Sequence, residues 1–168
     1  MNMKKFAVMI LALMLMATAA LADGPVLLME MPQDVQMVED VMFDDGDFVQ
    51  TYQLGGGASV HLLRYAAFDM TIDELIASEW DGAQNVAAMA ISSVGGHPAM
   101  GVTLSSVHDG AGMVEVTIIM VDYGAGKLVF EAVVPQGNAQ AAASVKQMIA
   151  TMDVLSDGAA GSDEAEVG

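Results

Sequence analysis

PAMGVTLSSVHDGAGMVEVTIIMVDYGAGKLVFEAVVP, residues 98–135, is the stretch that decides the fold class. Met100, Val102 and Leu104 alternate with small or polar residues, as a strand with one wet face requires. Turns rich in Gly then separate this strand from two strongly apolar runs. The stretch therefore predicts three successive antiparallel strands, at about residues 98–107, 113–121 and 127–134.

The flanking residues extend the predicted sheet and cover it. Upstream, turns rich in Asp and Gly divide residues 35–66 into a meander of three further strands. Thr71 and Glu74 have the spacing of a capping box, which predicts a helix that ends near Trp80. Downstream, Asn138 is a good N-cap for a second helix. Its apolar stripe is Ala142, Val145, Met148, Ile149 and Met152.

These patterns predict an α+β fold, a twisted antiparallel sheet of about six strands flanked by helices. Three segments are less determined by their composition. Residues 25–31 are apolar and fit an edge strand, and residues 154–155 fit a short last strand. Residues 84–89 are ambiguous, because their Ala content favours a helix whereas Ile91 and Val94 beyond them favour a strand.

The order of elements from His97 to Leu155 resembles that of exported domains related to DcrB and PsbP, which share the Mog1/PsbP-like fold. The resemblance rests on Gly96-His97-Pro98-Ala99 opening a strand and on a closing helix that ends in Met148-Ile149-Ala150-Thr151-Met152. It implies a three-layer α/β/α sandwich with an antiparallel sheet. It also implies accessory or binding roles rather than a reaction, and it carries no catalytic residues to numbered positions.

The N-terminus has the features of a secretory leader. Lys4 and Lys5 precede an uninterrupted apolar run, and Ala20-Leu21-Ala22 supplies a small-x-small cleavage site. We expect a signal peptide at 1–22, a single domain at 23–155 and a disordered acidic tail at 156–168, with an uncleaved membrane anchor as the alternative. The cleaved protein is expected in the periplasm or medium, without stable membrane insertion.

Charge restricts the partners of the exported chain. Removal of the leader takes away two of the five basic residues and none of the 22 acidic ones, which leaves a formal charge of −19. Such a charge repels nucleic acid and anionic lipid, because both are bound through Lys and Arg. A basic envelope protein is an acceptable partner. The chain has no Cys, so it forms neither a disulfide nor a Cys-ligated zinc site.

The common catalytic motifs are missing from the sequence. There is no Cys nucleophile, G-x-S-x-G elbow, H-E-x-x-H or phosphate-binding loop. We therefore expect no enzyme and no cofactor, but an exported, non-catalytic accessory or binding module. The alternative of a small hydrolase without a recognisable motif stays open.

Two sets of residues are candidates for a site. His61 and Arg64 lie on opposite faces of one predicted strand, where either side chain can line a pocket, and Trp80 is the only Trp. Met29, Met31, Met37 and Met42 form the second set. Thioether sulfur is a soft ligand that suits Cu(I), so a copper carrier that uses Met and His is a further alternative. The competing interpretation is that Met fills the core.

Overall fold

A computed structural model describes residues 24–33, 35–124 and 126–155. The predicted signal peptide, its cleavage site and the acidic tail lie outside the described residues. Within the described ranges, no helix is long and apolar enough to cross a membrane.

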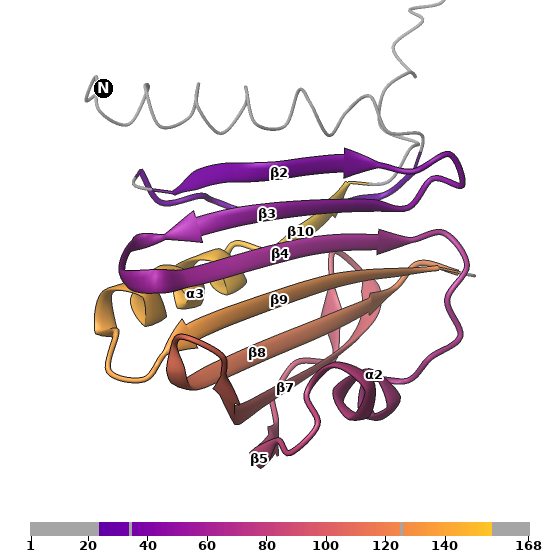
Figure 1. The fold of residues 1–168 in the computed structure, drawn as a ribbon. Helices are drawn as coiled ribbons and strands as arrows, with labels where there is room; N and C mark the ends of the chain where they lie inside the picture. The colour runs from indigo at the N-terminus through magenta and orange to yellow at the C-terminus, as the bar shows by residue number, and fades with distance from the viewer. Residues whose placement is uncertain (1–23, 34, 125, 156–168) are drawn as a thin grey trace, which may run out of the picture.

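The described chain is built around one antiparallel sheet of eight strands (Figure 1). The prediction of an antiparallel sheet in an α+β fold is confirmed in outline, but the expected number of about six strands is too low. In spatial order the strands are β2 (Gln36–Met42), β3 (Phe48–Leu54), β4 (Ala58–Tyr65), β9 (Lys127–Pro135), β8 (Gly112–Asp122), β7 (His97–His108) and β5 (Gln84–Ala88), with β6 (Ser93–Val94) also paired to β7.

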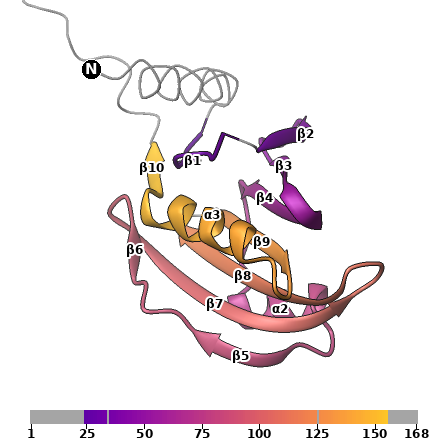
Figure 2. The same ribbon diagram turned by 90° about the vertical axis from the view of Figure 1, so that its left-hand side faces the viewer.

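The ambiguous segment is strand β5, which pairs with β7. Its Ala residues favour a helix locally, but the outer edge of β7 offers hydrogen-bond partners that only an extended chain can meet. Residues 25–31, the expected edge strand, form only the short β1 (Val26–Leu28). It pairs with β10 (Asp153–Leu155) in a separate two-stranded sheet beside the end of the last helix (Figure 2).

Both expected helices are present and begin where their caps predict. In α2 (Ile72–Glu79) the Thr71 hydroxyl accepts a hydrogen bond from the Glu74 backbone N–H, and the Glu74 carboxylate accepts one from the Thr71 backbone N–H. In α3 (Ala139–Ala150) the Asn138 side chain accepts from the N–H of Ala141. In Figure 1, α2 lies in front of the sheet and α3 behind it.

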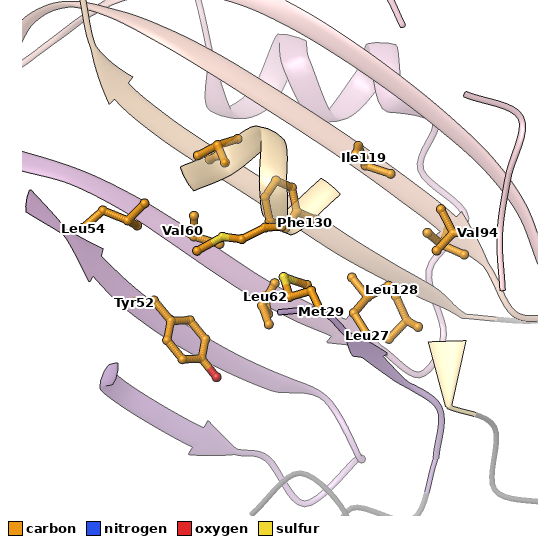
Figure 3. Close-up of a cluster of buried hydrophobic side chains, with 14 of the residues drawn as sticks. Leu27, Met29, Tyr52, Leu54, Val60, Leu62, Val94, Ile119, Leu128 and Phe130 are labelled. Atoms are coloured by element: carbon orange, nitrogen blue, oxygen red, sulfur yellow. The ribbon is translucent and has the colours of Figure 1, made fainter. Parts of the chain in front are cut away.

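Each helix covers its own hydrophobic core. The core under α3 contains the fully buried Phe130, Leu128 and Met148, and Figure 3 shows part of it. The core under α2 contains Ile118 and Val116 from the other face of the sheet. The predicted stripe of α3 packs on this core: Val145 and Met148 are buried in it, and Ala142, Ile149 and Met152 are partly buried against it. The buried Ala141 was not part of the predicted stripe.

Candidate functional site

The predicted site residues of strand β4 lie on opposite faces of the sheet. Ala58, Val60, Leu62 and Arg64 are buried on the α3 face, and the alternating residues, among them Ser59 and His61, face the α2 side. The structure therefore brings His61 and Trp80 together in one pocket and leaves Arg64 on the other side of the sheet.

The surroundings of Arg64 indicate a structural role. It is only 2% exposed, its Nε–H donates to the carbonyl oxygen of Gly46 at 2.7 Å, and its guanidinium lies 5.1 Å from the ring centroid of Phe48. Its Nη1 has no hydrogen-bond partner within the described part of the chain. Gly24 approaches so closely that a Cβ there would lie 2.5 Å from this Nη1. Arg64 thus joins the turn before β3 to the chain that leads into β1.

The pocket that contains the two other candidates has a volume of about 260 Å³. Strands β4 and β9 supply its floor, because His61 and Glu131 are directly opposite each other in the antiparallel register. The end of α2 forms one wall and the end of β7 another. We call it the His61 pocket, and its polar and aromatic lining residues are Ser59, His61, Glu79, Trp80, His108 and Glu131.

Trp80 connects the helix end to the floor of the His61 pocket. Its indole Nε1–H donates to Oε2 of Glu131 at 3.0 Å, and its ring centroid lies 6.1 Å from that of His108. The ring is buried against the core under α2. This bond holds the Glu131 carboxylate in place, and a carboxylate can accept further hydrogen bonds beyond one.

A chain of hydrogen bonds fixes the orientation of His61. The Thr51 hydroxyl donates to Oε2 of Glu39 at 2.8 Å and lies 3.2 Å from Nδ1 of His61, while Oγ of Ser59 lies 3.1 Å from Nε2 of His61. Because the single hydroxyl proton of Thr51 points to Glu39, Thr51 accepts from Nδ1–H. In neutral His61, Nε2 is then the acceptor and Ser59 donates to it. The remaining lone pairs of Ser59 are acceptors at the edge of the pocket.

The lining of the His61 pocket is rich in negative charge. Glu79 and Glu131 contribute carboxylates, and none of the described lining residues is Lys or Arg. The negative charge also acts on the neighbouring Tyr65. Burial raises the pKa of its phenol, and the nearby carboxylates of Glu79, Asp47 and Glu131 raise this pKa further. The pocket therefore presents hydrogen-bond acceptors, an indole and two imidazoles to a ligand.

The four methionines of the predicted copper set lie in different environments. Met29 is buried in the core under α3 (Figure 3), and Met31 packs against that core. Met37 and Met42 are exposed on the edge strand β2. Among the described residues, no group of three or more His, Asp or Glu side chains is arranged to hold a metal ion.

Sequence reasoning did not select Ser59, His108, Glu79 or Glu131 as site residues. The pairing of His61 with Glu131 depends on β4 lying beside β9, two strands that are far apart in the chain. His108 lies at the end of β7, 47 residues after His61 in the chain, so spacing alone does not bring the two together. The one local signal in the sequence was the spacing of Ser59 and His61, which are two residues apart and therefore lie on the same face of a strand.

Comparisons with known proteins place the chain only loosely. No protein-family model matches it, and no curated protein matches it. Among solved structures it is similar to the crystal structure of LpqN involved in cell envelope biogenesis of Mycobacterium tuberculosis. The identity is 12% and the TM-score 0.41, over 77% of this chain and 83% of that one. This is a weak similarity at the level of the fold.

Proposed function

We propose that the mature chain is an exported, non-catalytic binding module that holds a cationic group in the His61 pocket. The observation that carries the proposal is the joint presence of two carboxylates, Glu79 and Glu131, beside Trp80 in a cavity whose described lining has no Lys or Arg. The group is an amine or a guanidinium, on a small molecule or on a basic side chain of an envelope protein.

Three properties of the His61 pocket favour a cation over a neutral ligand. Its carboxylates form charge-assisted hydrogen bonds, which are stronger than neutral ones. The indole of Trp80 adds a cation–π contribution of about 0.5 to 2 kcal/mol if the ligand lies over its face. The formal charge of −19 expected after leader removal raises the local concentration of cations and their on-rate.

The size of the pocket limits the ligand. At about 260 Å³ it lies just below the range of ligand cavities, about 300 to 1,000 Å³, which suits one side chain or a molecule of similar size. A long basic peptide would therefore place one residue in the pocket and leave the others on the acidic surface around it.

Calorimetric titration with Nα-acetylated arginine amide and Nα-acetylated citrulline amide, called arginine amide and citrulline amide below, tests the proposal, because acetylation removes the α-ammonium from both molecules. Citrulline has nearly the same shape but a neutral urea group, so only the charge differs. We expect saturable binding of arginine amide and at least tenfold weaker binding of citrulline amide. Glu131→Gln keeps an acceptor for Trp80 but removes the charge, and should weaken binding about tenfold, or 1.4 kcal/mol.

The matched control is Asp44→Asn, which removes one carboxylate from the exposed turn between β2 and β3. It should leave the affinity almost unchanged. Equal binding of the two amides, or equal losses in Glu131→Gln and Asp44→Asn, would refute binding in this pocket. A basic peptide that binds when free arginine amide does not would assign the pocket to a protein partner.

A second candidate function is acyl transfer by Ser59, the small-hydrolase alternative. The specific observation is the Ser59 hydroxyl at 3.1 Å from Nε2 of a His61 whose Nδ1 is held by Thr51. In such a step the Ser59 oxygen attacks the carbonyl carbon, Nε2 takes the proton and passes it to the leaving group, and water then cleaves the acyl-enzyme.

Labelling with a fluorophosphonate probe separates this candidate from simple binding. An adduct on Ser59, detected by peptide mass and lost in His61→Gln, would support acyl transfer. Absence of an adduct at millimolar probe would leave the His61 pocket a binding site alone.

A further inference from the structure

A second cavity on the α2 side of the sheet is lined by three methionines. It has a volume of about 310 Å³ and lies between the chain before α2 and the strands β7 and β8. Met70 comes from the chain before α2, Met100 from β7 and Met120 from β8. None of the three belongs to the predicted copper set, and none lines the His61 pocket.

The sheet register places two of these methionines side by side. Met100 and Met120 are directly opposite each other in the antiparallel β7–β8 pair. Their Cβ atoms are therefore about 4.5 to 5.5 Å apart and their side chains leave the sheet on the same face. Two thioethers at this separation reach a common ion by rotation about their side-chain bonds.

The third methionine approaches from above the sheet. Met70 directly precedes Thr71, whose hydrogen bonds with Glu74 fix the start of α2. Met70 lines the same cavity as the cross-strand pair. Three methionines from three segments of the chain therefore border one space.

Packing accounts for two of these methionines but not for the third. Met120 is 6% exposed in the core under α2 and the partly buried Met70 packs against that core, but Met100 is 63% exposed. An exposed methionine gains little from hydrophobic burial, so its thioether is available to solvent and to a ligand.

The cavity is also anionic, as a cation site requires. Asp69, Asp73 and Asp122 line it together with one basic residue, Lys127, whose ammonium pairs with Asp122. Carboxylates are hard ligands that suit Cu(I) poorly, so here they contribute negative potential while sulfur supplies the ligands.

We propose that Met70, Met100 and Met120 bind one soft monovalent cation, Cu(I), through their three thioether sulfurs. A thioether carries no proton, so binding releases none from the ligands, in contrast to His or Cys sites. The site is thus separate from the His61 pocket in both position and chemistry, and the chain can hold both ligands at once.

Native mass spectrometry with Ag(I), a redox-stable soft cation, tests the site on the mature protein. We expect one Ag(I) per chain, held with nearly constant affinity from pH 8 to pH 5.5, where imidazole ligands would become protonated. Met100→Leu should weaken binding at least tenfold, and the double variant Met100→Leu, Met120→Leu should abolish it.

The matched control is the double variant Met37→Leu, Met42→Leu, which removes two exposed methionines on β2. It should bind Ag(I) as the wild type does. Leu is nearly isosteric with Met, and Met100 is largely exposed, so Met100→Leu should leave the fold intact. Far-UV circular dichroism checks this.

Three results would overturn the proposal. They are unchanged binding in Met100→Leu, loss of binding in the β2 control, and X-ray absorption spectra of the Cu(I) complex that show only nitrogen or oxygen ligands. Sulfur ligation that is lost in the Met100→Leu, Met120→Leu variant would establish it. Arginine amide binding to the His61 pocket should be the same in that variant, so the two sites are tested independently.

Discussion

The hydrogen bond between Trp80 and Glu131 holds the His61 pocket together, and a double-mutant cycle measures its strength. Trp80→Phe keeps an aromatic ring in the core under α2 but removes the Nε1–H that donates to Glu131 at 3.0 Å. Glu131→Leu removes the acceptor at similar side-chain size. The double variant removes both, so the cycle isolates the contact from the change in ring area and strand propensity.

The magnitude follows from the charge and exposure of the pair. A hydrogen bond to a charged group contributes about 1.5 to 3 kcal/mol. Glu131 is only partly buried, so solvent offsets part of this. We expect a coupling free energy of about 1 to 2 kcal/mol in urea unfolding followed by far-UV circular dichroism, because Trp80→Phe removes the only Trp. A coupling below about 0.3 kcal/mol would refute a structural role for this bond.

Three further predictions follow from other parts of the structure. Met148→Ala should lower the free energy of unfolding, measured in urea, by about 2 to 5 kcal/mol, because Met148 is 0% exposed under α3. Ile149 is partly buried, so Ile149→Ala should lower it by less. Equal losses in the two variants would contradict the assigned helix face. Burial, and secondarily Asp40, raises the pKa of Tyr52 from 10.0 to about 12. The neutral phenol is therefore favoured in the folded state, so the contribution of Tyr52 to the free energy of unfolding, about 2 to 3 kcal/mol, is present below pH 10 and is lost as pH rises towards 12. Tyr52→Phe should remove this part of the stability loss at alkaline pH. A pH profile of stability that is unchanged in Tyr52→Phe would contradict this role of Tyr52. The intact mass of the exported protein should correspond to a chain that begins at Asp23, and a species that keeps Lys4 and Lys5 and stays with membranes would identify an anchor instead.

The strands and caps were predictable because their signals are local. Gly and Asp turns separate the strands, and Thr71 and Asn138 mark the two helix starts. The segment Gln84–Ala88 was not predictable, because its neighbour β7 decides its conformation. The pairing of β1 with β10 joins the two ends of the described chain, and no local pattern encodes it.

The site was predictable only in part. His61 and Trp80 were selected one at a time, and their convergence depends on α2 packing over β9, an arrangement that spacing does not reveal. The Met100 and Met120 pair is different. The predicted turn at residues 108–112 already implies that these two residues, equally far from its centre, lie opposite each other. The sequence therefore contained this signal, but the copper prediction selected the methionines clustered nearer the N-terminus instead.

The central claim, a cation in the His61 pocket, is tested most directly by the indole N–H resonance of Trp80. The chain has one Trp, so a ¹H–¹⁵N spectrum contains a single indole signal, and this N–H donates to Glu131 at the floor of the pocket. Titration with arginine amide should shift this signal saturably, citrulline amide should leave it in place, and Glu131→Gln should weaken the response about tenfold. A signal that moves with neither arginine amide nor a basic peptide, or that moves equally with both amides, would contradict the account.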